Sequence, residues 1–246
     1  MTTDKFAAKM TAAYKSFDQH AILKDVNLQI ETGKIIGLIG PSGAGKSTTI
    51  KCLLGMEKLD QGESTVFQTK MPNRKILSRI GYMGQSNALY NELTAKENLL
   101  FFGQLTEMSK EELTQAIERT MNLVNLNEFI DQLVVTYSGG MKRRLSLAIT
   151  LLADPDLIVL DEPTVGIDPS LRAAIWNQLR LLTEAEKTII VTTHVMDEAE
   201  KCDAVGLIIA GKIFAFGSPT ELKQKFKVHS IEEVFLKAEG ETNEAF

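Results

Sequence analysis

A glycine-rich segment near residue 40 constrains the fold of this 246-residue chain more than any other feature of the sequence. It fits the pattern G-x-x-x-x-G-K-[ST] and lies between an apolar run and a helical pattern. Glycines let the backbone curl so that successive N–H groups point inward, and a helix N-terminus adds the positive end of its dipole. The segment therefore predicts a phosphate-binding loop rather than an ordinary glycine-rich turn. Its residues are Gly40, Pro41, Ser42, Gly43, Ala44, Gly45, Lys46, Ser47 and Thr48.

The composition is that of an ordinary globular domain. A net charge of −5 without a basic run argues against nucleic acid as the main partner. Neither a signal peptide nor an apolar run of the roughly 20 residues that span a bilayer is present in the sequence. We therefore expect a cytoplasmic chain that reaches a membrane only through a partner.

Strand and helix patterns alternate along most of the chain. Short apolar runs predict buried strands at 34–40, 79–84, 157–161 and 188–193. Alternating Val26, Leu28 and Ile30 predict an antiparallel N-terminal sheet. The alternation favours an α/β fold with a mainly parallel sheet covered on both faces.

The stretch 94–153 is different because it reads as almost entirely helical. Thr94 with Glu97 and Ser109 with Glu112 fit capping boxes, and Asp168 before a proline predicts a further helix start. We expect one domain with an inserted helical lobe. Its parts are the core at 1–93 and 154–225, the lobe at 94–153 and a terminal helix or tail at 226–246.

Two acidic residues, Asp161 and Glu162, end the strand predicted at 157–161. Ligands of open α/β sheets bind at the carboxyl ends of the strands, so we expect this pair beside the phosphate loop. Asp161 is expected to hold Mg²⁺ through water, together with the Ser47 hydroxyl, and Glu162 to act as the base that polarises the attacking water. An apolar strand that simply ends in solvated acids is the plainer alternative.

The string Tyr137-Ser138-Gly139-Gly140-Met141 resembles the signature of the ATPase subunits of ATP-binding-cassette (ABC) transporters, usually written LSGGQ. Together with the phosphate loop and the acidic pair, the resemblance covers essentially the whole chain. It implies a P-loop NTPase core that binds ATP and Mg²⁺, and a head-to-tail dimer. In that dimer Ser138, Gly139 and Gly140 bind the γ-phosphate of the ATP held by the other subunit. Tyr137 and Met141 depart from the usual Leu and Gln.

The resemblance also implies roles for single residues. Gln85 fits the glutamine that meets Mg²⁺ and water, and His194 the histidine that hydrogen-bonds the γ-phosphate. Asp168 fits an aspartate that communicates across the dimer, besides capping a helix. An aromatic ring that stacks on adenine is expected in the N-terminal sheet, where Phe17 is favoured and Tyr14 is the alternative.

Three strings further resemble bacterial type-2 exporters, namely 89–94, 141–145 and 230–236. The last also fits any docked terminal helix, because its apolar residues follow a helical stripe. The implied partners are a second ATPase subunit and a membrane permease that seats on residues 85–102.

Three alternative functions are an ABC protein acting on ribosomes or DNA, a small-molecule kinase and a nucleotide-binding regulator without hydrolysis. The first is disfavoured because the sequence shows no second cassette, and the second because a kinase would leave the signature string unexplained. The third is disfavoured by the presence of Glu162 and His194.

Overall fold

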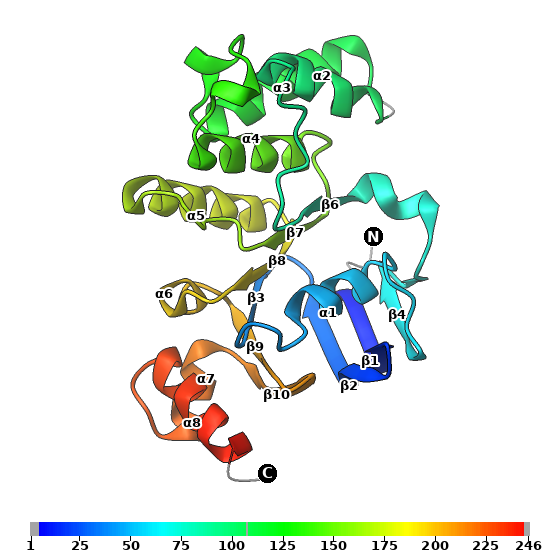
Figure 1. The fold of residues 1–246 in the computed structure, drawn as a ribbon, viewed down its shortest axis with the longest axis vertical. Helices are drawn as coiled ribbons and strands as arrows, with labels where there is room; N and C mark the ends of the chain where they lie inside the picture. The colour runs from blue at the N-terminus through cyan, green and yellow to red at the C-terminus, as the bar shows by residue number, and fades with distance from the viewer. Residues whose placement is uncertain (1–4, 107, 244–246) are drawn as a thin grey trace. The chain divides into compact units, whose positions relative to one another are not determined.

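The computed structural model describes residues 5–106 and 108–243 (Figure 1). The chain divides into two compact units, the first made of Met1–Lys75 and Thr188–Phe246 and the second of Ile76–Lys187. The second unit thus groups the helices of 94–153 with two strands and a further helix, so its limits differ from those of the lobe expected from the sequence. Each unit is described in turn.

An antiparallel sheet forms the N-terminal part of the first unit. Its strand order is β2-β1-β4-β5. The strands are β1 (Phe6–Phe17), β2 (His20–Glu31), β4 (Gln61–Val66) and β5 (Thr69–Lys70). Asp18 and Gln19 join β1 to β2 with positive φ at both positions, the geometry of a two-residue hairpin turn that follows the strand twist. The alternation at Val26, Leu28 and Ile30 places all three side chains in the core, which confirms the predicted antiparallel sheet.

Parallel strands form the second sheet of this unit. The order is β10-β9-β3-β8, with β3 (Ile35–Ile39) parallel to both β8 (Thr188–Thr193) and β9 (Ala204–Ile209). β10 (Lys212–Gly217) closes the edge as an antiparallel hairpin partner of β9. Every residue of β3 and β8 is buried, as expected of strands covered on both faces. The helices of the unit are α1 (Lys46–Leu53), α6 (Met196–Ala199), α7 (Pro219–Phe226) and α8 (Ile231–Asn243).

The second unit has two parallel strands and four helices. β6 (Ile80–Met83) pairs with β7 (Leu157–Asp161) in the register Met83 opposite Leu160. The helices are α2 (Ala95–Gln104), α3 (Lys110–Leu123), α4 (Gly139–Leu151) and α5 (Pro169–Glu184). Short 3-10 turns occupy Arg74–Arg79, Asn127–Phe129 and Val134–Thr136.

The predicted helix starts are all confirmed. Thr94 and Ser109 each form a complete capping box with the glutamate three residues on, and the Asp168 carboxylate accepts a hydrogen bond from the Leu171 N–H. The strands keep their predicted places with small shifts of their ends, β2 being longer than the alternation alone indicates. The antiparallel sheet, the parallel strands and the helices together confirm the predicted α/β class.

Reciprocal arginine contacts join α3 and α4. Arg119 on α3 donates to the carbonyl oxygens of Leu151 and Leu152 at the end of α4. Arg144 on α4 donates to those of Val124 and Asn125 at the end of α3. Because the last carbonyls of a helix lack partners within it, each arginine satisfies the free end of the other helix. The contacts fix α3 and α4 as an antiparallel pair.

Candidate active site

The phosphate loop runs from the end of β3 to the start of α1, as the sequence predicts. Gly43 and Gly45 have φ of 78° and 103°, a region that side-chain-bearing residues rarely adopt. A Cβ atom on Gly45 would also lie only 3.1 Å from Leu23. In the described part of the chain, no side chain caps the start of α1 and its first turn contains no acidic residue. The turn therefore presents backbone N–H groups to an anion such as a phosphate.

Lys46 lies inside this loop and is only 8% exposed. Its ammonium group donates to the carbonyl oxygens of Gly40 at 2.7 Å and Pro41 at 2.9 Å. The loop thus curls around a buried cation, next to the first-turn residues Ser47 and Thr48, both half-buried. A buried positive charge and the backbone N–H groups of a helix N-terminus fit the polyphosphate of a nucleotide.

His194 reaches the same edge of the sheet as the phosphate loop. β3 and β8 are parallel with Ile39 opposite Thr193, and the loop and His194 follow these two residues directly. Thr193 fixes the turn, because its hydroxyl donates to the buried Glu198 carboxylate at 2.7 Å and accepts from the Val195 N–H at 3.0 Å. His194 itself is exposed. The first unit therefore brings the phosphate loop and His194 together.

The two aromatic candidates for adenine lie on β1 of the same unit. Phe17 is 41% exposed and Tyr14 38% exposed. The Lys15 ammonium lies 4.8 Å from the centre of the Phe17 ring. Exposure leaves both rings able to stack on a base, so the assignment of Phe17 stays a prediction.

The acidic pair and Gln85 come together in the second unit. Asp161 ends β7 and is 2% exposed, while Glu162 follows it with a φ of 53°. Gln85 follows the neighbouring parallel strand β6, and the register of the two strands brings both ends to one edge. A glutamate in the left-handed region is held there by its surroundings at a cost in backbone strain. Its carbonyl oxygen accepts a hydrogen bond from Arg143 at 2.8 Å.

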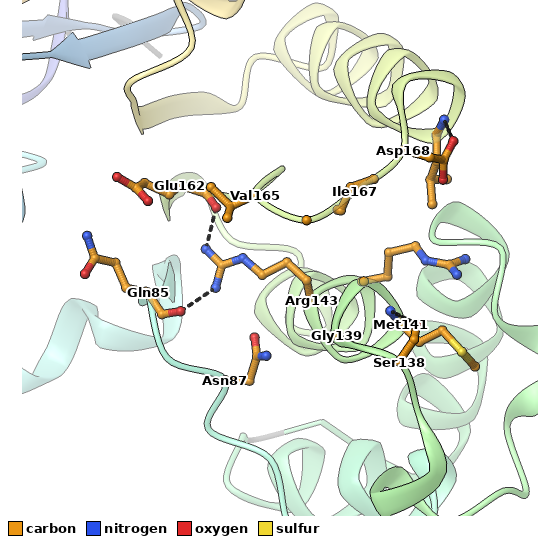
Figure 2. Close-up of a pocket in the computed structure, with 14 residues that line it drawn as sticks. Gln85, Asn87, Ser138, Gly139, Met141, Arg143, Glu162, Val165, Ile167 and Asp168 are labelled. Atoms are coloured by element: carbon orange, nitrogen blue, oxygen red, sulfur yellow. Dashed lines mark hydrogen bonds between the residues drawn. The ribbon is translucent and has the colours of Figure 1, made fainter.

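A pocket of about 590 Å³ opens beside these residues (Figure 2). The N-termini of two helices, α4 and α5, line it through Ser138 and Asp168. The Ser138 hydroxyl accepts from the Met141 N–H at 3.2 Å, and Asp168 accepts from Leu171 at 3.0 Å. The helix-capping role of Asp168 is thus confirmed, and communication across a dimer stays a prediction. Apart from its chain neighbours and the backbone of its own helix, no described atom lies within 4 Å of the position that a Cβ atom on Gly139 would take.

Tyr137 stands where the ABC signature usually has Leu, and the structure explains this difference. Its ring is 5% exposed, and its hydroxyl donates to the Phe129 carbonyl oxygen at 2.7 Å. Burial raises the pKa of this hydroxyl, which keeps it protonated as a donor. Tyrosine therefore replaces a purely apolar residue here with one that also ties the helix start to the 3-10 turn Asn127–Phe129.

The family comparison decides the class of the chain. Residues 23–165 match the family described as ABC transporter. The chain belongs to the ABC transporter family. It is an ATP-binding and ATP-hydrolysing member, as the three motifs predict.

Relatives within the ABC family include the Nod factor export ATP-binding protein I of Rhizobium sp. (strain N33). It is 40% identical over 234 residues, which cover 94% of this chain and 77% of that protein. The protein of the same name from Rhizobium meliloti is 41% identical over 87% of this chain and 64% of its own length.

Solved structures agree with the family. An ATP-binding subunit of an ABC transporter has a TM-score of 0.87 at 24% identity, covering 94% of this chain and 99% of that one, which shows the fold. A dimeric ATP-binding cassette in a post-hydrolysis state, bound to ADP and Pi, has a TM-score of 0.78 at 27% identity over 86% of this chain and 98% of that one.

The donor set suits Mg²⁺ better than a transition metal. Among the residues that the structure describes, no group of three or more His, Cys, Asp or Glu side chains could hold a metal ion. Mg²⁺ needs no such cage, since it is commonly held by one or two protein oxygens, waters and substrate phosphates. The Ser47 hydroxyl in the first unit, and the Gln85 amide and Asp161 carboxylate in the second, are oxygen donors of this kind, and their role at Mg²⁺ stays a prediction.

Arg143 is the residue that sequence reasoning missed. It is 5% exposed, lines the pocket and contacts the backbone beside both Gln85 and Glu162. The only local signal was a run of three basic residues, 142–144, after the double glycine, where one of the three turned out to be buried. Basic residues on a helix are usually solvated, so the pattern gave no reason to expect a buried guanidinium.

Proposed function

We propose that the chain is the ATPase subunit of an exporter, which dimerises around two Mg·ATP and drives a membrane permease by closing and reopening. The observation that carries the proposal is the occurrence on one chain of two anion sites at helix N-termini, the phosphate loop and the pocket at Ser138. The Nod factor export proteins at about 40% identity favour export over import.

We assign the reaction to a small set of side chains. Lys46 and the loop N–H groups bind the β- and γ-phosphates, and Mg²⁺, when bound, neutralises charge on the same oxygens. Asp161, with Ser47 and Gln85, would hold the ion. The Glu162 carboxylate accepts a proton from the attacking water as the new P–O bond forms at the γ-phosphorus and the bond to the β-phosphate oxygen breaks. His194 donates to the γ-phosphate.

The pocket at Ser138 is proposed to receive the γ-phosphate of the ATP that a second subunit binds. The N-terminus of α4 supplies N–H groups there, and the Ser138 oxygen uses a lone pair for its cap, so its proton is available to a phosphate oxygen. One chain alone then holds only half of each site. Asp168, on the rim of the same pocket, lies where the subunits would meet.

The permease is proposed to seat on the segment 85–102. Tyr90 and Phe101 are 46% and 38% exposed, and their ring centres lie 4.8 Å apart in an edge-to-face pair. Asn98, which is fully buried, accepts from the N–H and donates to the carbonyl oxygen of Tyr90, and so fixes the backbone that carries this ring. Exposed, rigidly held aromatic rings are typical of interfaces. In the described ranges no helix could cross a membrane, so we propose that this contact holds the chain at the cytoplasmic face.

The test is reconstitution with a candidate membrane permease from the same genome. The complex in lipid vesicles should hydrolyse ATP faster than the chain alone, and Phe101→Ala should lose both association and stimulation. Phe216→Ala, on the edge strand β10 of the other unit and 42% exposed, is the matched aromatic control. Candidate substrates supplied on the ATP side should accumulate on the opposite side. Copurification with ribosomes and no membrane protein would contradict the proposal.

A further inference from the structure

A single buried guanidinium joins three segments of the second unit (Figure 2). Arg143, on the first turns of α4, donates through one terminal nitrogen to the carbonyl oxygens of Gly84 at 2.7 Å and Gln85 at 3.1 Å. Its other terminal nitrogen donates to the carbonyl oxygens of Asp161 and, at 2.8 Å, Glu162. One side chain thus holds the backbone of both segments that carry the proposed water-handling groups.

Arg143 is a buried cation, and its hydrogen bonds offset part of the cost of that burial. Burial lowers the pKa of the guanidinium, and the nearby Asp161 and Glu162 charges oppose that effect. A buried cation is costly unless its donors are satisfied. Four carbonyl oxygens accept from the two terminal nitrogens here, while Nε has no hydrogen-bond partner among the described residues. The planar fork of arginine can serve two pairs of acceptors at once, whereas the compact ammonium of a lysine cannot.

We propose that Arg143 is a positioning residue for ATP hydrolysis, which sets the backbone of Glu162 and Gln85 relative to the signature helix α4. The proposal rests on the roles proposed above for those two residues. The left-handed backbone at Glu162 is held in part by its bond to Arg143, so the bond also sets the direction of the Glu162 side chain. Because Arg143 lies one turn after Ser138, the helix that would bind the second subunit's phosphate is tied directly to the base.

A purely structural role is the competing explanation, and Arg119 provides the matched control. Arg119 likewise donates to two backbone carbonyl oxygens in this unit, those of Leu151 and Leu152 at the far end of α4. Those carbonyls belong to none of the segments to which we assign chemistry. Arg119→Met should therefore lower the melting temperature and leave turnover close to that of the unaltered chain.

The experiment measures kcat, KM, the Kd for ATP and the melting temperature for Arg143→Met, Arg143→Lys and Arg119→Met. We expect kcat of Arg143→Met to fall by about tenfold or more, because a small displacement of a catalytic group is that costly. The Kd for ATP should stay near the starting value, because the phosphate loop is not among the contacts of Arg143. Arg143→Lys should fold and give an intermediate kcat, since it keeps the charge but reaches fewer carbonyls.

Two results would overturn the proposal. One is a kcat in Arg143→Lys and Arg143→Met equal to that of Arg119→Met, with all three differing only in melting temperature. The other is a loss confined to ATP affinity. If Arg143→Met does not fold, an unaltered kcat in Arg143→Lys is itself the overturning result. Glu162→Gln, measured alongside, distinguishes a failure of the positioning role of Arg143 from a failure of the proposed function. Full activity in that variant would refute the proposed function.

Discussion

The ammonium group of Lys46 donates a 2.7 Å hydrogen bond to the carbonyl oxygen of Gly40, across the mouth of the loop that joins β3 to α1. The bond fixes the position of the positively charged ammonium group within the loop. It lies inside the curl of the backbone, at the side of the loop that a polyphosphate would occupy. We therefore expect this lysine to contribute to the binding of nucleotide.

Replacing this lysine should weaken nucleotide binding without unfolding the chain. Lys46→Ala removes charge-assisted hydrogen bonds of about 1.5–3 kcal/mol, so we expect the Kd for ATP to rise roughly ten- to hundredfold. Isothermal titration calorimetry measures it. Lys51→Ala, an exposed lysine on the same helix, is the control and should bind ATP normally. Unchanged affinity in Lys46→Ala would contradict the phosphate-loop assignment.

A methyl group at Gly139 should separate function from stability. The Cβ of Gly139→Ala would meet no described atom within 4 Å other than those of its chain neighbours and its own helix backbone, and alanine is favoured over glycine in a helix by up to about 1 kcal/mol. The melting temperature should therefore stay the same or rise. The methyl group would stand where we place the second subunit's phosphate, so ATP turnover should fall by roughly tenfold or more. Turnover within twofold of the starting value would remove Gly139 from the phosphate site.

The local parts of this structure were predictable from the sequence, because their causes are local. The phosphate loop, the capping boxes at Thr94 and Ser109 and the cap at Asp168 each depend on residues a few positions apart. The contacts of Arg143 were not predictable, since its carbonyl partners lie 18 to 59 residues away along the chain. Strand β9 was not among the predicted strands, although its mainly apolar run from Val205 to Ile209 is a signal that predicts a buried strand.

The aromatic partner of adenine is open to a direct comparison of two variants. Phe17→Ala should weaken ATP binding by about 1–3 kcal/mol, the usual worth of a base stacked on an aromatic ring. Inorganic triphosphate, which has no base, should bind as before. Tyr14→Ala serves as the matched variant and should bind ATP normally. The reverse pattern would move the role to Tyr14.

The capping boxes predict a pH dependence of stability. In the box at Ser109, hydrogen bonds from the Ser109 N–H and hydroxyl lower the pKa of Glu112. A carboxyl whose pKa is lower in the folded state stabilises the fold above its unfolded value of about 4.3, and that contribution is lost as the pH falls through the lower folded value. Glu97 and Glu221 have the same arrangement and the same direction of shift.

Urea denaturation at pH 7 and pH 4 measures this dependence. Glu112→Gln, which cannot titrate, should lose less stability between the two pH values than the unaltered chain does. Glu111→Gln removes a carboxylate from the same turn and leaves the box intact, so it should keep the full pH dependence of the box. Identical pH profiles for Glu112→Gln and Glu111→Gln would show that the box does not contribute.

We propose that Glu162 activates the water that cleaves ATP held between two copies of this chain, and a single variant tests this role. Glu162→Gln keeps the shape of the side chain but cannot accept the proton of the attacking water. Sedimentation equilibrium with Mg·ATP, read beside phosphate release, should show a stable dimer with no turnover, and a monomer when ADP replaces ATP. Phosphate release by Glu162→Gln at the rate of the unaltered chain, or a monomer at saturating Mg·ATP, would contradict the account.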